Sequence, residues 1–398
     1  MWKLQENILE EVDKKFLVDF INSTNRFTQF EKVKKFESDW SKWQGCFYTT
    51  FVNSGSSADL IMLDAVKELY GIDDGAEVLV PAVTWTTNVT SIVQNKLKPV
   101  FVDINLNDLS FDYKKLECSV TSKTKIILIT HLIGIPANID KIKSIADRHD
   151  LIILEDCCES HGATYNGKKV GNFGLASTFS FYWGHHMTSV EGGVICTENE
   201  ELYDLCILKR SHGLARELDL SKHQKYKNAY PDIDFNFLFL TQGYNVRNTE
   251  LHAVLGSEQL KHLDRYIEIR NSNHKKFLDI LDFLKEKLYV VDNPGISSFC
   301  LPFIFKDRHD RITLQKSLDL HNIESRPIIG GNLLRQPCFS GYARYKDFPH
   351  AEIIHQNGIY IGNNQFVNDE RLKILEDIIK KNFGRNYVYN QNNLSEII

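Results

Sequence analysis

Short apolar runs separated by helical patterns fill residues 77–156, and they constrain the fold more than any other feature of the chain. The runs VLVP, KIILIT and LIILED are apolar at consecutive positions, which is typical of strands buried on both faces. Strands of this kind, separated by helices, predict a mostly parallel sheet with helices packed on both sides. Ligands of such sheets bind at the carboxyl ends of the strands.

The composition is that of an ordinary soluble globular protein. Of the 398 residues, 42% are hydrophobic and 25% are charged, and the chain is long enough for a large core and a second, smaller domain. The formal charge of −5 and the lack of a dense basic run disfavour nucleic acid or a membrane surface as a partner. The first residues are charged and amphipathic, unlike a signal peptide, and no apolar run is long enough to span a membrane.

Cysteine usage bounds the compartment and the cofactor chemistry. The eight cysteines are scattered through apolar runs, as buried thiols in a reducing compartment are, so we expect a cytoplasmic protein. None of them has the C-x-x-C spacing of a zinc or redox site, and we therefore expect no metal.

Polar side chains follow the predicted strands where a pocket is expected. The loop at residues 53–58, NSGSSA, opens a helix predicted over residues 59–70, so its amide groups and hydroxyls suit an anion such as phosphate, although serine-rich helix caps are common. Asp156 ends the apolar run LIIL, where a helix N-cap is the alternative interpretation. Trp85 and Glu159 also follow strand ends, although Trp85 alone would be read as a core residue.

Two adjacent histidines, His185 and His186, follow a strand predicted over residues 179–183. Glu191-Gly192-Gly193 then marks a turn before a second strand, residues 194–197. Histidines at the exit of a buried strand are poorly placed for core packing and well placed for a pocket. A satisfied structural histidine is the alternative.

This histidine segment, residues 180–193, resembles the cofactor-lysine segment of the vitamin B6-dependent sugar aminotransferases of the DegT/StrS type. That family holds S-F-x-x-x-K-x-x-x-x-x-E-G-G, and here His185 stands where the family has the lysine that binds the cofactor. No lysine lies between residues 170 and 208 to replace it. A histidine at this position resembles the 3-dehydratase branch of the family.

The resemblance implies roles for residues around a pyridoxal phosphate. It implies that Asp156 keeps the pyridine nitrogen protonated, which lets the cofactor accept electrons. Trp85 resembles the aromatic residue that stacks on the ring, and Glu159 the residue that contacts the ring hydroxyl. The same resemblance assigns the cofactor phosphate to three serines, Ser56, Ser57 and Ser180.

Residues 243–247, GYNVR, match the family motif GYNxR. The match implies that Asn245 reaches the cofactor phosphate of a partner subunit, that Arg247 belongs to the same shared site, and that the protein is a homodimer. His212 and Arg216 resemble residues that line the nucleotide-sugar site, where an arginine suits a diphosphate.

The family fold is implied as well: fold type I, like aspartate aminotransferase, with a large α/β domain and a smaller C-terminal α+β domain. We divide the chain into a large cofactor-binding domain, residues 1–258, and a small domain, residues 259–398. Residues 250–269 predict a long helix leading away from the large domain. Residues 387–398 show no core pattern and are expected to form a loose tail.

Histidine cannot form the covalent tether that lysine forms, so the resemblance implies a cofactor held noncovalently as pyridoxamine phosphate. Imidazole titrates near neutrality, which suits His185 as the base that removes a proton from the cofactor. The expected reaction removes the 3-hydroxyl of a GDP-4-keto-6-deoxy sugar and gives a GDP-4-keto-3,6-dideoxy sugar. L-glutamate is expected to restore the cofactor amine.

Three alternatives stay open at this point. CDP-sugar relatives with the same histidine hold an iron–sulfur cluster on four cysteines that include a C-x-C pair, and this chain has no C-x-C. A nucleotide-sugar 4-aminotransferase would need Lys168 or Lys169 at the cofactor, but YNGKKVG predicts an exposed hairpin. A non-catalytic nucleotide-sugar-binding protein would explain the lost lysine but not the retained Asp156 and Glu159.

Overall fold

The computed structural model of the chain describes residues 1–384. The tail expected at residues 387–398 therefore lies outside the described residues. None of the helices within residues 1–384 combines the length and apolar character needed to cross a membrane.

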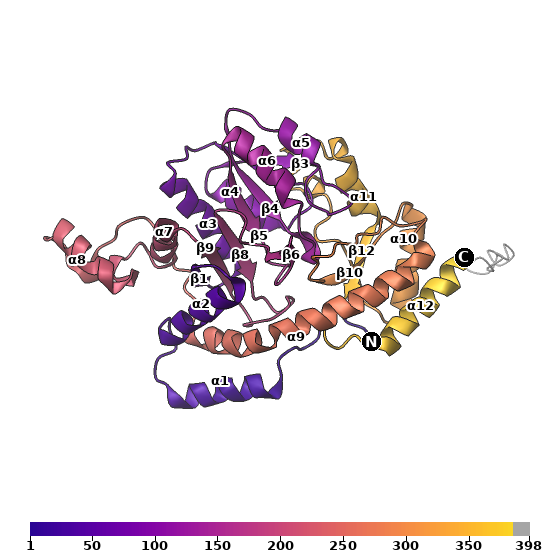
Figure 1. The fold of residues 1–398 in the computed structure, drawn as a ribbon, viewed down its shortest axis with the longest axis horizontal. Helices are drawn as coiled ribbons and strands as arrows, with labels where there is room; N and C mark the ends of the chain where they lie inside the picture. Colours follow the sequence, from indigo (N-terminus) through magenta and orange to yellow (C-terminus); the bar gives the residue numbers. More distant parts are fainter. Residues whose placement is uncertain (385–398) are drawn as a thin grey trace.

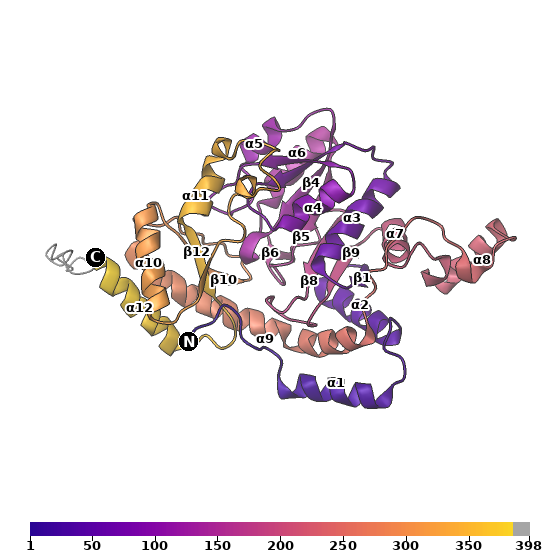
Figure 2. The ribbon, with the colours of Figure 1, turned by 180° about the vertical axis from the view of Figure 1, so that it is seen from behind.

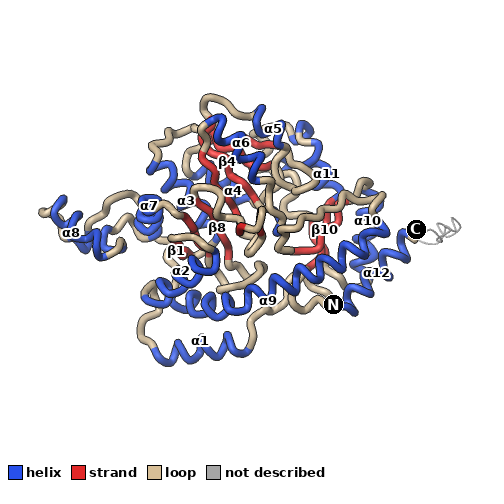
Figure 3. Tube along the Cα trace, in the orientation of Figure 1, coloured by secondary structure: helices blue, strands red, loops and turns tan. Residues whose placement is uncertain are grey.

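A seven-stranded sheet forms the centre of the molecule, and its strand order is β1-β9-β8-β5-β4-β2-β3 (Figures 1 and 3). All its neighbouring strands are parallel except β9, which runs antiparallel to both β1 and β8. This confirms the predicted α/β class with a mixed, mostly parallel sheet. The strands are β1 (Tyr48–Val52), β2 (Glu77–Pro81), β3 (Lys98–Val102), β4 (Thr124–Thr130), β5 (Ile152–Asp156), β8 (Ala176–Ser180) and β9 (Gly193–Thr197).

Helices cover both faces of this sheet, which explains the continuous apolar runs. In β4, Ile126 and Leu128 pack with helices on one face, whereas Ile127 and Ile129 pack with helices on the other. Alternate residues of a strand point to opposite faces, so an apolar residue is needed at every position. The first face carries α3 (Gly55–Leu69), α4 (Thr86–Gln94) and α7 (Glu200–Arg210), and the second carries α5 (Tyr113–Cys118) and α6 (Ile139–His149).

The longest helix, α9 (Glu250–Leu281), runs past the large sheet to the small domain, and α1 (Glu11–Ser23) and α2 (Glu31–Gln44) lie against it (Figures 1 and 2). The helix predicted over residues 8–21 begins later, because Glu10 and Asp13 form a capping box. The predicted domain boundary at residue 258 lies inside α9, so the division of the chain at that point stays a prediction.

The small domain pairs an antiparallel three-stranded sheet, in the order β10-β12-β11, with three helices. A separate segment with α8 (Leu220–Ala229) extends away from the body (Figure 1). The small-domain elements are β10 (Cys300–Ile304), α10 (Arg308–Leu320), β11 (Ser325–Pro327), α11 (Pro349–Asn357), β12 (Gly358–Gly362) and α12 (Asp369–Phe383).

Two predicted boundaries near the pocket differ from the structure. The helix predicted from residue 59 begins at Gly55, because the Ser54 side chain accepts a hydrogen bond from the Ser57 amide and caps the first turn. The strand predicted over residues 179–183 ends at Ser180, whose partner in β9 is Gly193, the first residue of that strand. Residues 181–192 therefore form a loop, hereafter the histidine loop.

Candidate active site

A cavity of about 630 Å³ lies at the carboxyl ends of β4, β5 and β8, with residues of the small domain completing its wall. This is where ligands of a parallel sheet are expected. The structure brings six of the sequence-predicted residues together here: Ser56, Trp85, Asp156, Glu159, Ser180 and His185.

The first turn of α3 forms one end of the cavity. Ser54, Gly55 and Ser56 line it together with Ser180 at the end of β8. A Cβ atom on Gly55 would lie 2.6 Å from the Ser180 Cβ atom, so this close approach requires glycine. The start of a 15-residue helix with free hydroxyls fits a phosphate group. Ser57 does not line the cavity, because its amide and hydroxyl both bind Ser54.

Asp156 is the last residue of β5 and is held by two hydrogen bonds. Its Oδ2 accepts from Asn88 Nδ2 at 2.8 Å, and its Oδ1 accepts from the Cys158 amide at 2.8 Å. Asn88 also donates to Asp59 Oδ2 at 3.1 Å. Burial, together with the charge of Asp156, raises the pKa of Asp59 well above its ordinary value. Burial beside Asp156 therefore favours the protonated form of Asp59.

Glu159 presents a protonated carboxyl group at neutral pH. Burial raises its pKa to about 8, even though its Oε2 accepts the Ile133 amide at 2.9 Å. Ile133 has a φ angle of 48°, a left-handed conformation that β-branched residues rarely adopt. The bond to Glu159 is one of the contacts that hold this strained turn beside the cavity.

His185 lies in the histidine loop with its ring packed against Tyr182, His161 and Phe299, at centroid distances of 6.1, 6.1 and 5.7 Å. Neither ring nitrogen hydrogen-bonds to another group within residues 1–384, and Nε2 is the one that is not buried. Burial first, and then the charge of Arg270, lower the pKa of His185 to about 4. A neutral imidazole with an open nitrogen is suited to accept a proton.

The neighbouring histidine, His186, points away from the cavity. Its ring is fully buried, and its Nε2 lies 3.1 Å from Ser297 Oγ and 3.2 Å from the Ser297 carbonyl oxygen. Two adjacent residues of similar sequence context therefore have different environments.

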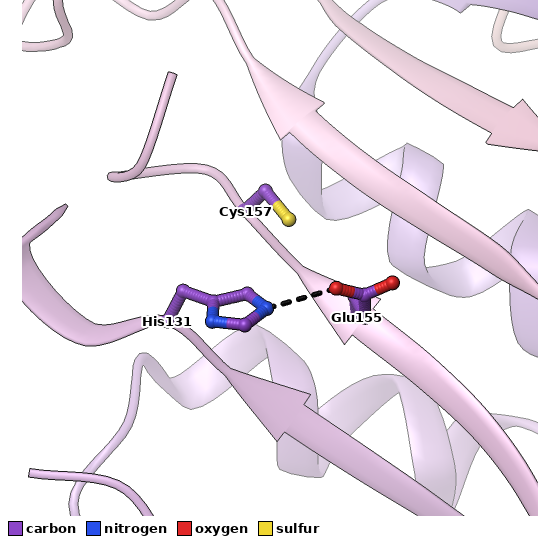
Figure 4. A group of neighbouring side chains, drawn as sticks. All are labelled: His131, Glu155 and Cys157. Carbon is purple, nitrogen blue, oxygen red and sulfur yellow. Dashed lines mark hydrogen bonds and ion pairs between the residues drawn. The ribbon is translucent and has the colours of Figure 1, made fainter. Parts of the chain in front are cut away.

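A second buried group, His131 with Glu155 and Cys157, lies at the ends of β4 and β5 (Figure 4). His131 Nδ1 accepts the Ala137 amide at 3.1 Å, so Nε2 carries the proton that it donates to Glu155 at 3.0 Å. Glu155 also accepts three backbone amides, from Gly171, Phe173 and Gly174. These atoms lie close enough for a metal site, but the hydrogen bonds of His131 and Glu155 already engage both of these side chains, so we assign the group a structural role.

Besides Ser57, four predicted residues do not reach this cavity within one chain. Arg247 Nε donates to Asn245 Oδ1 at 3.2 Å, and Arg216 donates to the Asn236 carbonyl at 2.8 Å. His212 adopts a left-handed φ of 62°, and its amide bonds to the Tyr244 carbonyl. His212, Asn245 and Arg247 flank the projecting segment, residues 214–243, and Arg216 lies within it. This segment exposes apolar side chains at Leu220, Tyr230, Ile233, Phe237 and Phe239.

Sequence reasoning missed several residues of the cavity wall. Arg326 is the only arginine or lysine that lines the cavity within the described part of the chain, and its run SRPIIGGN could have drawn attention to it. Gln5 also lines the cavity and donates to the Trp183 carbonyl at 3.0 Å, and no local pattern signals this contact.

The two lysines of the rival interpretation lie on the hairpin of β6 (Thr164–Tyr165) and β7 (Lys168–Lys169), as predicted. Lys168 donates to the Asn172 carbonyl at 2.6 Å, and Lys169 lies 3.6 Å from the centre of the Trp43 ring. Neither lines the cavity.

Comparison with known proteins agrees with this site. Residues 8–379 match the DegT/DnrJ/EryC1/StrS aminotransferase family. A relative from Escherichia coli O55:H7, GDP-4-keto-6-deoxy-D-mannose 3-dehydratase, is 36% identical over 391 residues, which cover 95% of this chain and 99% of the relative. A solved structure of GDP-4-keto-6-deoxymannose 3-dehydratase with a trapped PLP-glutamate geminal diamine has a TM-score of 0.88 and 35% identity, covering 96% and 100% of the two chains. A mutant of that enzyme with bound GDP-perosamine has a TM-score of 0.87 and 36% identity, with the same coverage.

Proposed function

The chain belongs to the DegT/DnrJ/EryC1/StrS aminotransferase family, and we propose on that premise that it is a pyridoxamine phosphate-dependent 3-dehydratase of a GDP-4-keto-6-deoxy sugar. The observation that carries the proposal is His185, which presents an open nitrogen to the cavity where the family has its lysine. No lysine lines the cavity within residues 1–384, so transamination through a lysine-bound cofactor is disfavoured.

The residues present fit the cofactor. Ser56 and Ser180 lie where they would bind its phosphate, and Trp85 would cover the ring. Asp156, held at the end of β5 by the Asn88 side chain, would hold a proton on the pyridine nitrogen. When bound, the cofactor supplies the electron sink for the reaction. Glu159, protonated at neutral pH, would donate its O–H to an oxygen of the ring.

His185 provides the base. As the open nitrogen, Nε2 accepts a proton when the neutral ring carries its own proton on Nδ1. Its pKa of about 4 is lower than the near-neutral value expected from the sequence, because burial and Arg270 disfavour the imidazolium. The ring is therefore in its acceptor form across the physiological range, and its imidazolium is a stronger acid than that of a free histidine. The resulting imidazolium can then return a proton to the departing 3-hydroxyl group, which would leave as water.

The cavity wall supports an anionic substrate. Arg326 is the one permanent cation on that wall within residues 1–384, and a guanidinium suits the diphosphate of a nucleotide sugar. L-glutamate is the proposed amino donor, in line with the PLP-glutamate adduct in the related dehydratase. A cytoplasmic location agrees with eight cysteines that are all free.

We also propose a homodimer with shared active sites. Asn245 and Arg247 match the GYNxR motif yet lie outside the cavity of their own chain. The projecting segment beside them exposes apolar side chains, with Phe237 at 64% and Phe239 at 57%, as a surface that contacts another subunit would. Sedimentation should therefore show a dimer at assay concentration, and an active monomer would contradict the shared site.

Subunit complementation tests the sharing directly. His185→Asn and Asn245→Ala should each be inactive alone. Mixed and reassembled in equal amounts, they should regain about a quarter of the wild-type activity, because half of the dimers are mixed and each mixed dimer has one intact site. Activity that stays at the level of the separate variants would show that Asn245 serves no partner site.

The reaction itself is tested by the product. The protein is incubated with a GDP-4-keto-6-deoxy sugar, pyridoxal phosphate and L-glutamate, and the product is identified by mass spectrometry. The proposal expects a keto sugar lighter than the substrate by one oxygen atom, with 2-oxoglutarate as the co-product. An amino sugar would show a 4-aminotransferase, and unchanged substrate bound at stoichiometric amounts would show a binding protein.

A further inference from the structure

Arg270, in the middle of α9, is a buried cation without an acidic partner among residues 1–384. Its side chain is 1% exposed, and none of its hydrogen bonds goes to a carboxylate. Its guanidinium instead donates to three backbone carbonyl oxygens, those of Phe299 at 3.1 Å, His185 at 3.5 Å and Asn363.

Such an arrangement is costly for folding. Burying an unpaired charge is unfavourable even after the surrounding protein relaxes. Buried arginines therefore normally have a carboxylate partner. Burial lowers the pKa of Arg270 to about 10, and the side chain nonetheless stays charged at neutral pH. A chain that only needed packing at this position would be more stable with an apolar residue, so the charge and the fork of donors call for another role.

The three carbonyls belong to the histidine loop and to the ends of two paired strands of the small domain. Phe299 directly precedes β10 and packs on the His185 ring, and Asn363 directly follows β12. Asn363 returns the contact by donating its side-chain amide to the Arg270 carbonyl at 2.9 Å. Arg270 is therefore the point at which α9, the small domain and the histidine loop are joined behind the cavity.

Resting on the proposed function, we propose that Arg270 is a positioning residue for His185: its guanidinium fixes the main chain of the base against the ends of β10 and β12. An arginine suits this position because its planar guanidinium presents several N–H donors, which lets one side chain reach all three carbonyls. Its charge has a second effect, since it opposes a proton on the neighbouring imidazoles.

Arg270 is the charged group that lowers the pKa of His185. Burial and Arg270 together lower the pKa values of His185, His161 and His186. Four carboxyl side chains and Arg326 also line the cavity, but burial and the charge of Arg270 are the causes that lower the pKa of His185. The titratable groups around His185 and on the cavity wall are His131, His161, His186, Tyr182, Tyr360, Cys158, Cys300, Arg270, Arg326, Asp156, Glu159, Glu191 and Glu324.

Two variants separate the fork from the charge. Arg270→Lys keeps the charge but loses the fork, so the dehydration kcat should fall by about tenfold or more at every pH while the acid limb of the pH profile stays in place. Arg270→Met removes both, so kcat should fall and the acid limb should also move up toward the ordinary histidine pKa of about 6.5. Arg265→Met, an exposed arginine on the same helix, is the matched control and should change neither.

A measurement on the chain without cofactor tests the same idea independently of turnover. NMR titration of ¹³C-labelled histidines, with the His185 signal identified by its loss in His185→Asn, should give a pKa near 4 in the wild type and a higher value in Arg270→Met. If Arg270→Met does not fold, as judged by thermal unfolding, the wild-type titration and the lysine variant still decide the question.

Failure of the two proposals gives different results. No dehydration by the wild type, with a shifted His185 titration in Arg270→Met, would overturn the proposed function and leave the role of Arg270 intact. A folded Arg270→Met variant with wild-type kcat, acid limb and titration would overturn the role of Arg270, as would a wild-type His185 that titrates near 6.5.

Discussion

Two histidines, His131 and His185, line the same cavity after β4 and β8, two strands of one sheet that are separated by β5, but their hydrogen bonding differs completely. His131 uses both ring nitrogens, one toward Glu155 and one toward the Ala137 amide. His185 uses neither within the described chain and instead has a buried arginine behind it. His161 also leaves both ring nitrogens without a partner among the described residues, but it is fully buried, whereas His185 lines the cavity and has its Nε2 open to it. The open position, together with the missing partner, marks His185 as the group available to a ligand.

The same contrast holds for two acids four residues apart. Glu155 is as buried as a carboxylate can be, yet the His131 hydrogen bond and backbone amides outweigh the burial and lower its pKa. Glu159 has one amide partner, and burial raises its pKa to about 8. Glu155 and His131 stabilise the fold. Glu159 and His185 face the cavity, where a cofactor would complete their hydrogen bonds.

The largest effect should come from His185→Asn. Asparagine preserves the size and polarity of the side chain but cannot accept the proton, so the dehydration rate should fall by about 10² to 10⁴-fold. The free energy of unfolding should change little, because no hydrogen bond of the His185 ring is lost. Steady-state kinetics and denaturant unfolding measure the two quantities. Near-normal dehydration, with collapse in a His186 variant instead, would show that the wrong histidine was chosen.

His131→Asn should give the opposite result. It removes the His131 N–H donor from the buried Glu155 carboxylate, which keeps its three backbone amides, and an unmade hydrogen bond of a buried polar group costs about 1–3 kcal/mol. Urea unfolding should show this loss, whereas the activity per folded molecule should stay close to that of the wild type. A stable but inactive variant would mean that His131 takes part in the chemistry and would remove the distinction between the two histidines.

Glu159→Gln tests the contrast between the acids through pH. A folded-state pKa of about 8 lies above the unfolded value of 4.5, so folding binds a proton between these values and wild-type stability is lost as pH rises through that window. The variant lacks this loss. Its unfolding free energy relative to the wild type should therefore rise with pH, by at most about 1.4 kcal/mol per unit. Denaturant unfolding over this range measures it, and a pH-independent difference would contradict a protonated Glu159.

His186→Asn should reduce the dehydration rate by less than about tenfold, below the loss expected for a general base. Its ring bonds only to Ser297 behind the cavity, so the variant removes packing rather than a proton acceptor. The ratio of the His185→Asn and His186→Asn rates is the relevant measurement. Equal losses would remove the assignment of the base to one member of the pair.

The smallest effects should come from Lys168→Ala and Lys169→Ala, which lie on the exposed hairpin and should change the dehydration rate by less than about twofold. Borohydride reduction of the wild type with pyridoxal phosphate should leave no cofactor on an active-site peptide. His185→Lys is the positive control, since an amine there should retain the reduced cofactor and abolish dehydration. Stoichiometric label on Lys168 or Lys169 would restore the aminotransferase interpretation.

Residues at the ends of predicted strands could be placed from the sequence. Asp156 and His185 reach one cavity because parallel strands bring their carboxyl ends to the same edge of the sheet. The first turn of α3 reaches this cavity as well. The choice between His185 and His186 came from family register and not from any local pattern, because the strand predicted to reach residue 183 ends at Ser180. Where the chain leaves the ladder, alternation no longer says which side chain faces which way.

The sequence by itself determined the class of fold and the available chemistry. It shows strands that are apolar at consecutive positions, a serine-rich loop at the start of a helix that suits a phosphate, and a histidine in place of a lysine. Only the tertiary structure decided which groups are left open and which residues complete the wall. Arg270 meets His185 and Asn363 across 85 and 93 positions, and Gln5 meets Trp183 across 178. Periodicity reports contacts within a few residues, whereas these contacts exist only once the small domain and the first residues have packed on the sheet.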